Sequence, residues 1–403
     1  MVQGGEGMAR LPDGRVCFVQ GALPGELCQV EIFQNKKDFT RGRTVRVLER
    51  SPDRATPKCP LYGKCGGCSL QHLESAAQAA CSERVERENF RRIARAELPE
   101  DFKIHVGPAW GYRNRARVVI SAGKDGKPFY GFRMQKSNGI VPFESCPVLT
   151  PAINGFLKQN ASRIYKEFVR DSRRPPRNFE LDVNVFDNGA GQVSYYYKGM
   201  LAADFERNAV CVVEIAGKKI CSDASVFFQS NLSLLPELVR SVQEAVDEGI
   251  ASGEASDAWL IDLFSGVGFF AAILRDRFRR VTTVERDEGC LKHARVNLSD
   301  SNGAPSVDVE NVSAPAEDWL SENVVDVPAT LIVDPPRTGL PPTALEAIAK
   351  SSVNRLIYVS CDPVTLARDF SKFREAGFSL KKAEGFAFYP QTPHLEMMFV
   401  LSR

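Results

Sequence analysis

The chain has 403 residues, enough for two or three domains, and its composition is that of an ordinary globular protein. The formal net charge is only +2, so the total charge does not by itself indicate a nucleic-acid partner. No apolar run reaches the roughly 18 residues that span a bilayer, and the N-terminus lacks the basic-then-apolar layout of a secretory signal. We therefore expect a cytoplasmic protein without a membrane partner, in which the 11 cysteines stay reduced.

Residues 1–54 are predicted to form a small β module. Short β-rich runs alternate with Asp-Gly and Pro-Gly turns, which is typical of a small OB-like barrel, and such barrels often bind oligonucleotides. The basic run at residues 40–50, TRGRTVRVLER, is a candidate phosphate-facing strand, with a solvated strand as the alternative.

A cysteine-rich segment follows a short linker. It reads KCPLYGKCGGCSLQH and places Cys59, Cys65 and Cys68 in C-x5-C-x2-C spacing. Soft thiolate ligands select zinc or an iron–sulfur cluster. The spacing differs from the C-x3-C-x2-C of radical S-adenosylmethionine proteins, which argues against that class. A fourth ligand has to come from elsewhere in the chain.

The pattern of apolar residues in the rest of the chain changes at about residue 225. Before it, residues 76–98 predict a helix with one basic face, and residues 112–198 are mostly β in pattern, with an exposed loop expected at 175–177. After it, apolar strands alternate with helical stretches, which is typical of a doubly wound parallel sheet. The last two apolar runs have no helix between them and can form a hairpin at the sheet edge. We predict a multidomain α/β protein with an OB-like domain at 1–54, a β-rich central domain at 55–224 and a Rossmann-like domain at 225–403.

The run WLIDLFSGVGFF predicts a nucleoside pocket in the Rossmann-like domain. A buried strand leads into a turn in which Gly266 and Gly268 let the backbone approach a ligand closely. Glu285 ends the next strand, where an acid can bind ribose hydroxyls. The turn lacks the third glycine of the dinucleotide fingerprint, which favours S-adenosyl-L-methionine over NAD.

Two further strand ends predict the chemistry. Asp334, in VDPPRTGL, falls at the carboxyl edge of the sheet, where ligands bind, and Arg337 stands where amine methyltransferases have a base-stacking aromatic residue. Cys361, in LIYVSCDPVTLARDF, ends another strand, with Asp362 as a helix N-cap. The helix N-terminus is expected to lower the pKa of the Cys361 thiol, with Asp362 partly opposing. A small buried hydrophobe is the alternative role for this cysteine.

A thiolate beside a methyl donor suits one reaction in particular. Uracil C5 is a poor nucleophile until a thiolate adds to C6, after which C5 accepts a methyl group and a base removes the C5 proton. Glu396, a lone carboxylate in the apolar run HLEMMFVL, is the candidate base, because burial would raise its pKa. A surface charge at a strand end is its alternative role.

Five motifs in order, CPLYGKCGGC, DLFSGVG, DPPRTG, VSCDP and PHLE, resemble the RNA uracil-5-methyltransferases of the iron–sulfur type. The resemblance covers nearly the whole chain, including a TRAM-like N-terminal module. It implies a [4Fe–4S] cluster on Cys59, Cys65, Cys68 and Cys146, with zinc as the alternative. No step of the methylation needs an electron, so such a cluster would be a structural staple or part of the RNA-binding surface. The remaining cysteines are read as structural: Cys17, Cys28, Cys81, Cys211, Cys221 and Cys290.

The resemblance also implies contacts to the methyl donor. Gln229, in FFQSN, and Phe264, in DLF, match residues near S-adenosylmethionine, and Glu285, Asp334, Cys361 and Glu396 match the roles given above. Phe269 departs from the pattern, because relatives often have Asn at that place, and Asn311 could supply the missing polar contact. Ser265 replaces a common cysteine.

RNA is the partner that this chemistry requires, and no obligate protein partner is indicated. The target uridine must lie in a loop or be flipped out of its stack. By resemblance, 23S ribosomal RNA is the first expectation, with transfer RNA as the alternative. A non-catalytic RNA-binding module is a further alternative, which the presence of Cys361 and Glu396 disfavours. The candidate phosphate contacts are arginines: Arg41, Arg43, Arg46, Arg84, Arg91, Arg92, Arg113, Arg115 and Arg117.

Overall fold

The computed structural model describes residues 1–171, 179–200, 210–299 and 307–403. The exposed loop expected at 175–177 lies outside this set. Among the described helices, none is both long and apolar enough to cross a membrane.

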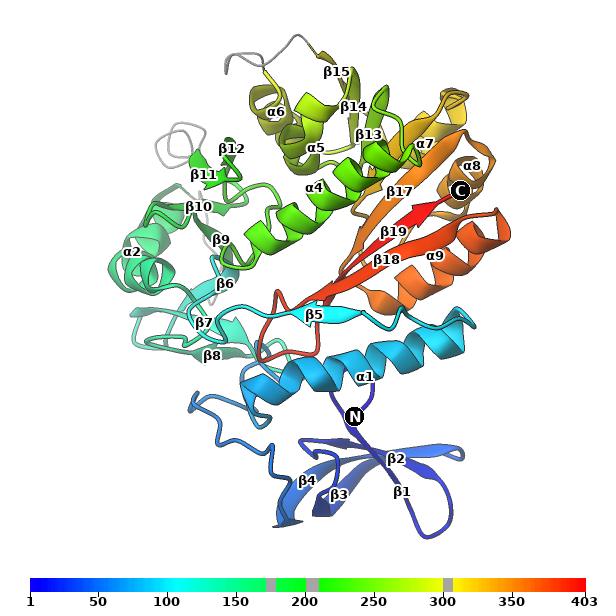
Figure 1. Ribbon diagram of the computed structural model, residues 1–403. Coiled ribbons are helices and arrows are strands. Elements are labelled where there is room, and N and C mark those ends of the chain that lie inside the picture. The colour runs from blue at the N-terminus through cyan, green and yellow to red at the C-terminus, as the bar shows by residue number, and fades with distance from the viewer. Residues whose placement is uncertain (172–178, 201–209, 300–306) are drawn as a thin grey trace.

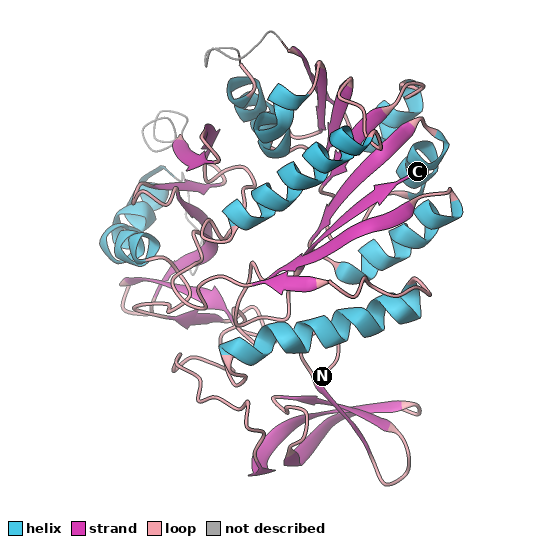
Figure 2. Cartoon of the chain, in the orientation of Figure 1, coloured by secondary structure: helices cyan, strands magenta, loops and turns pink. Residues whose placement is uncertain are grey.

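The N-terminal module is a four-stranded sheet. Its order is β1-β2-β4-β3, with β2 and β4 parallel and the other pairs antiparallel. Figure 2 shows this sheet on the far side of α1 from the large sheet of the molecule. Lys136 reaches it from the central region and donates to the Gln20 side chain (2.8 Å). The strands are β1 (Gly7–Arg10), β2 (Val16–Gln20), β3 (Leu27–Asn35) and β4 (Phe39–Glu49).

The central region contains a second sheet, of order β10-β9-β6-β7-β8. The helix α2 (Pro151–Asp171) packs on it. The sequence analysis read this region as mostly β and did not anticipate α2. Its apolar residues Ile153, Leu157 and Ile164 are buried at helical spacing, which is the signal that the β-rich surroundings obscured. The strands are β6 (Arg115–Ala122), β7 (Pro128–Arg133), β8 (Ile140–Pro142), β9 (Leu181–Asp187) and β10 (Val193–Tyr197).

A third, eight-stranded sheet has the order β15-β14-β13-β16-β17-β19-β18-β5. Its first five strands are parallel, and β19 runs antiparallel between β17 and β18. The strands β13 and β16 are buried throughout, as strands covered on both faces are. The strands are β5 (Lys103–His105), β13 (Trp259–Leu263), β14 (Arg280–Glu285), β15 (Asp308–Ser313), β16 (Ala329–Val333), β17 (Val353–Ser360), β18 (Ser379–Phe386) and β19 (Glu396–Ser402).

Helices cover both faces of the large sheet, as Figure 1 shows. One hydrophobic core joins the sheet to α4, α5 and α6, and a second joins it to α1, α7, α8 and α9. This arrangement confirms the predicted doubly wound α/β fold. The helices are α1 (Ser75–Ile93), α4 (Leu235–Ser252), α5 (Phe269–Leu274), α6 (Glu288–Asn297), α7 (Ala316–Glu322), α8 (Pro342–Lys350) and α9 (Pro363–Glu375), with a short 3-10 turn at Arg275–Arg277.

The predicted terminal hairpin is present as β18 and β19, but it does not form the sheet edge. The short strand β5 pairs in parallel with β18 and lies outside it. Both β5 and α1 come from the region expected to form the central domain, and Phe90 and Phe102 of this region join the second core. A two-stranded hairpin, β11 (Cys211–Ile215) and β12 (Lys218–Ser222), leads into the segment before α4.

Candidate active site

The glycine turn after β13 shapes the expected cofactor edge. Phe264, Gly266 and Gly268 all have positive φ, at +58°, +53° and +71°. A Cβ at Gly266 would meet nothing within 4 Å, so the backbone there borders open space, whereas a Cβ at Gly268 would lie 3.1 Å from Cβ of Ala294. The first glycine thus leaves room for a ligand, and the second permits close packing of α5 on α6.

Two carboxylates hold this turn. Glu285, at the end of β14, accepts a hydrogen bond from the Gly266 amide (3.0 Å). Asp262 in β13 is buried, accepts from the Ala271 amide (3.0 Å), and has its pKa raised to about 8 by burial. Asp262 was not among the predicted site residues, although an acid inside the apolar run WLIDL is a signal that the sequence contains.

The other expected cofactor contacts lie around this turn. Gln229 is buried in the segment before α4, and its carbonyl accepts from the Asn114 side chain (3.2 Å). Phe269 is buried against Phe228, with the ring centroids 5.7 Å apart, so the residue that departs from the family pattern belongs to the core. Asn311 lies within β15, where its side-chain oxygen accepts from the Thr283 hydroxyl (2.8 Å).

Three residues converge at the carboxyl ends of β16 and β17. Asp334 follows β16 and Cys361 follows β17, two neighbouring parallel strands. Because β19 runs antiparallel to β17, its first residue, Glu396, lies at the same end, one position beyond the Ser360–Met397 pair. The sheet therefore brings the proposed nucleophile, the proposed base and a second carboxyl group to one place.

Burial and charge set the proton affinities at this place. The pKa of the Cys361 thiol is raised to about 11, first by burial and then by the negative charges of Glu396 and Asp334, while Arg337 lowers it. The net shift is therefore opposite in direction to the lowering expected from the helix N-terminus. Asp362 caps α9 by accepting from the amides of Val364 and Thr365 (both 3.0 Å), and its own charge raises the thiol pKa.

The two carboxyl groups also favour their protonated forms. Glu396 is 4% exposed, and its pKa is raised well above the usual range, first by burial and then by the charge of Asp334. Burial raises the pKa of Asp334 to about 7. The alternative reading of Glu396 as a surface charge is excluded, and a buried carboxyl of this kind is suited to general-base work.

The four cysteines expected to hold a cluster lie outside the helices and strands, with Cys65 in an isolated bridge to Met134. They are half-buried, and burial raises the pKa of Cys65 and Cys146 and raises that of Cys68 to about 11. The charges of Cys65 and Cys59 both raise the pKa of Cys146, so these cysteines belong to one electrostatic neighbourhood. Within the part of the chain that the structure describes, no three His, Cys, Asp or Glu side chains are arranged to hold a metal ion as they stand.

The cysteine segment contacts the loop that leads into β19. The amides of Ser69 and Leu70 both donate to the Gln391 carbonyl (3.0 and 2.9 Å). Gln391 is 1% exposed with φ +71°, and its amide and side chain form a reciprocal pair with Gln78 of α1 (2.9 and 3.1 Å). This glutamine latch, made of Gln78 and Gln391, ties the cysteine segment and α1 to the loop just before Glu396.

The arginines expected to contact RNA differ in exposure and in local partners. Arg41, Arg43 and Arg46 are exposed on β4 of the N-terminal sheet, where Arg43 pairs with Glu31 (2.6 Å) and Arg41 lies 3.8 Å from Glu6. Arg115 is not available, because its buried guanidinium donates to the carbonyls of Asp223 and Ala224 (3.2 and 3.3 Å). Others are engaged in local contacts: Arg84 with Cys81, Arg91 with Glu88 and Arg117 with Asp182.

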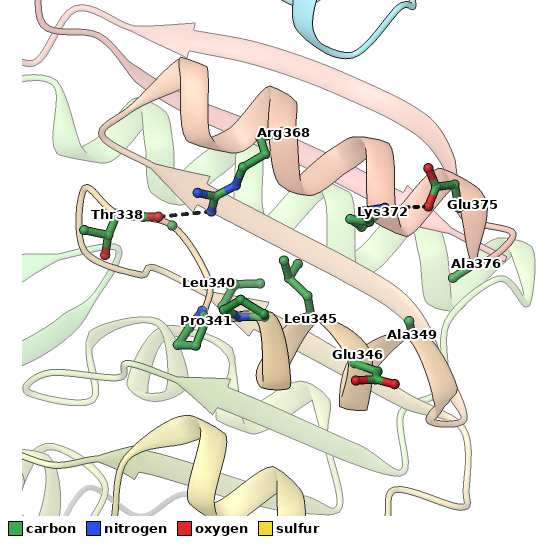
Figure 3. A pocket seen from close by; sticks show the side chains of 12 residues that line it. Thr338, Leu340, Pro341, Leu345, Glu346, Ala349, Arg368, Lys372, Glu375 and Ala376 are labelled. Carbon is green, nitrogen blue, oxygen red and sulfur yellow. Dashed lines mark hydrogen bonds and ion pairs between the residues drawn. The ribbon is translucent and has the colours of Figure 1, made fainter.

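A groove of about 760 Å³ lies between α8 and α9, and Figure 3 shows it extending from Thr338 toward Ala349 and Ala376. Its lining is mostly apolar and includes Leu340 and Leu345. None of the proposed catalytic or cofactor residues lines it, so it is separate from the reaction centre.

Comparison with known protein families gives two matches. The model for tRNA (uracil-5-)-methyltransferases matches residues 204–403, and the TRAM domain model matches residues 3–45. The second match agrees with the four-stranded N-terminal sheet.

Curated relatives span nearly the whole chain. An RNA methyltransferase of Treponema denticola is 31% identical, covering 100% of this chain and 97% of its own length. The 23S rRNA (uracil(1939)-C(5))-methyltransferase RlmD of Methylococcus capsulatus is 31% identical over 99% and 94%, and that of Chromohalobacter salexigens 32% identical over 99% and 87%. Among solved structures, the Pyrococcus abyssi tRNA (uracil-54, C5)-methyltransferase with S-adenosyl-L-homocysteine covers 98% of this chain and 99% of its own at a TM-score of 0.70 and 22% identity, which supports the fold.

Proposed function

Because this chain belongs to the RNA uracil-5-methyltransferases and depends on S-adenosylmethionine for its activity, we propose that its substrate is a uridine of 23S ribosomal RNA in the cytoplasm. The observation that carries the chemistry is the convergence of Cys361, Glu396 and Asp334 at one edge of the sheet. The choice of 23S RNA rests on the activity of two 23S rRNA methyltransferases that are 31% and 32% identical over 99% of this chain.

The covalent steps fall to Cys361. Its thiolate adds to C6 of the uracil ring, forming a C–S bond and an enolate that makes C5 nucleophilic. S-adenosylmethionine, when bound, supplies the methyl group from a sulfonium centre, and C5 takes it. Glu396 then accepts the C5 proton, and the electron pair of that C–H bond re-forms the C5–C6 double bond as the Cys361 sulfur leaves.

The residues that would hold the methyl donor surround the glycine turn. The open space beside Gly266 admits a ligand. Glu285 is the last residue of the neighbouring strand β14, and an acid at this position of a nucleoside-binding fold can accept hydrogen bonds from ribose hydroxyls. We assign Gln229 and Phe264 to the same site by resemblance, together with Gly268 and Asp334. Asn311 remains a weaker candidate, because its side-chain oxygen is already bonded to Thr283.

We infer further that Cys59, Cys65, Cys68 and Cys146 hold a [4Fe–4S] cluster that acts as a staple of the central domain. The donor set supports this, because four thiols that act on one another's pKa lie on irregular segments outside the helices and strands. Protein purified without oxygen should contain about four iron and four sulfide per chain. One zinc per chain and no sulfide would overturn the cluster and leave the methylation chemistry standing.

The substrate is tested by mass spectrometry of 5-methyluridine in ribosomal and transfer RNA from cells with and without the gene. Loss from one 23S fragment is the expected result. Loss from transfer RNA alone would overturn the target, and the description of the matching family model as tRNA methyltransferases makes that the second candidate. The mechanism is tested separately with 5-fluorouridine RNA. This substrate carries fluorine in place of the C5 hydrogen, so the base has no C5 proton to remove and the sulfur cannot be released. The enzyme should then be trapped as a covalent adduct that Cys361→Ala abolishes.

A further inference from the structure

The loop between β16 and α8, residues 334–341, is fixed to helix α9 at three points. The Thr365 hydroxyl donates to the Arg337 carbonyl (3.3 Å). The Arg368 guanidinium donates to the Thr338 carbonyl (3.0 Å), a bond drawn in Figure 3. The Leu340 amide donates to the Asp369 carboxylate (2.9 Å). These contacts lie on successive turns of one helix face, so α9 holds the loop along its length.

Asp369 is the buried anchor of this contact. It is 0% exposed and accepts from the Tyr358 hydroxyl of β17 (2.7 Å) and from Arg368 (2.7 Å), besides the Leu340 amide. Hydrogen bonds to a buried carboxylate are strong because the local dielectric is low. A Cβ at Gly339, where φ is +74°, would lie 2.6 Å from Arg368 Nη2 and 2.7 Å from Asp369 Oδ2. The loop backbone therefore lies directly on these two side chains.

The same loop and helix carry the charges around the nucleophile. Asp362, the cap of α9, follows Cys361 directly, and the loop carries Asp334 and Arg337. Glu396 of β19, Asp334 and Asp362 act on the Cys361 thiol with negative charge, and Arg337 acts on it with positive charge. The charges of Asp334 and Arg337 act on the Glu396 carboxyl as well, the first raising its pKa and the second lowering it.

Tyr389 and His394, from the loop before β19, belong to the same electrostatic neighbourhood. The charges of Glu396 and Cys361 act on Tyr389, and those of Arg337 and Asp362 act on His394. The Arg113 cation acts on both Tyr389 and His394, whereas the positive charge that acts on the Cys361 thiol is that of Arg337. The position of Arg337 therefore determines how far the surrounding negative charge is offset at the thiol.

We propose that Thr365, Arg368 and Asp369 are positioning residues that hold the loop so that Arg337 stands beside Cys361 and Glu396. This inference deepens the proposed function and rests on it. A loop released from α9 would move the Arg337 cation away from both groups. The thiolate and the carboxylate would then lose their nearby positive charge, and Cys361 would need a higher pH to react.

The first test measures Cys361 without RNA. The variant Thr365→Val/Arg368→Gln removes two of the three loop contacts at partly exposed sites, and Asp369→Asn keeps the shape of the third residue. Lys372→Gln is the matched control, because it removes an exposed cation one turn further along α9 that pairs with Glu375 (2.9 Å). Alkylation of Cys361 by iodoacetamide is followed against pH by peptide mass spectrometry. We expect the midpoint to rise by about one pH unit in the loop variants and to stay unchanged in the control.

The second test measures the covalent step. Adduct formation with 5-fluorouridine RNA and S-adenosylmethionine should slow by about 10- to 100-fold, with the melting temperature close to that of the wild type. A lower melting temperature with an unchanged alkylation profile would show a merely structural role and overturn the proposal. If the double variant does not fold, Thr365→Val alone is measured in the same way. An absent adduct in the wild type would refute the proposed function, whereas the alkylation profile still decides the positioning role.

Discussion

The reaction centre and the cysteine array are built by opposite means. Asp334, Cys361 and Glu396 stand at the ends of three neighbouring strands of one sheet, and backbone pairing fixes their spacing. The four cysteines of the array lie outside the helices and strands, and Cys65 is in an isolated bridge to Met134. Single backbone bonds, such as that from the Gly66 amide to the Arg133 carbonyl (3.0 Å), hold this segment. The first site is therefore spaced by a continuous sheet ladder, whereas the second is spaced by isolated contacts of irregular segments.

This difference predicts how each site responds when one of its side chains is removed. Removing a side chain at the reaction centre should leave the sheet intact and stop chemistry. Removing a thiol from the array should loosen irregular backbone, and the effect should reach Glu396 through the contacts of Ser69 and Leu70 with Gln391. Five predictions test this contrast.

The largest effect is expected for Cys361→Ala. Methylation should fall at least about 1,000-fold, because the covalent step has no other nucleophile of this kind at the site. The melting temperature and the iron content should match those of the wild type. The measurement is methyl transfer from labelled S-adenosylmethionine to unmodified RNA, and residual activity near the wild-type level would contradict the assignment.

Glu396→Gln should slow turnover by about 100- to 10,000-fold while leaving the first covalent step possible. The methylated adduct can then form but loses its C5 proton slowly. Denaturing gels should show the enzyme covalently attached to ordinary uridine RNA in the presence of S-adenosylmethionine. If Glu396→Gln accumulates no adduct and still turns over, another group is the base.

Activity should rise with pH. The thiol pKa of about 11 means that the reactive thiolate is scarce at neutral pH, and it becomes more abundant as pH increases. Glu396 must also be unprotonated to act, and its raised pKa works in the same direction. The value of kcat/KM should fall about tenfold or more per pH unit below pH 8. A rate maximum at pH 6 would show that RNA binding rearranges these charges.

Cys68→Ser should lower the stability of the protein, and any effect on the methylation rate should follow from that loss. If the array holds a staple, this variant should lose iron and melt at least about 5 °C lower than the wild type. Cys361→Ser is the matched control, because it changes a thiol to a hydroxyl at the site that the sheet fixes. Equal iron contents and equal melting temperatures in the two variants would remove the contrast.

The smallest effect is expected for the glutamine latch. Gln78→Leu removes the partners of the Gln391 amide and side chain, so a buried donor is left unpaired, and the free energy of unfolding should fall by about 1–3 kcal/mol. Urea denaturation measures it, with Arg91→Gln on the exposed part of α1 as the control. A change no larger than that of the control would show that the latch contributes little.

The proposed catalytic residues could be predicted from short motifs in the sequence. Cys361 follows the apolar run of one strand and Glu396 begins that of another, and such runs mark where a strand starts and ends. Their convergence follows from the terminal hairpin, whose strand β19 returns antiparallel to β17 and starts where β17 ends.

Contacts between distant segments were not predictable. Gln78 and Gln391 are 313 positions apart, and nothing local to either indicates the pair. Arg115 looked like a surface cation in alternation with its neighbours, yet tertiary packing turned its guanidinium onto two buried carbonyls. The raised pKa of the Cys361 thiol comes first from burial and then from the charges of Glu396 and Asp334, and only the folded sheet provides both.

The pairing of β5 with β18 has a consequence for anyone who divides the protein for expression. A fragment that begins at about residue 225 would contain the whole glycine turn and both proposed catalytic residues, yet β18 would lack its outer neighbour. Its unpaired edge and the apolar surface that Phe90 and Phe102 cover would then face water. Such a fragment should aggregate, because an open strand edge templates association between chains. A soluble fragment would have to start before α1.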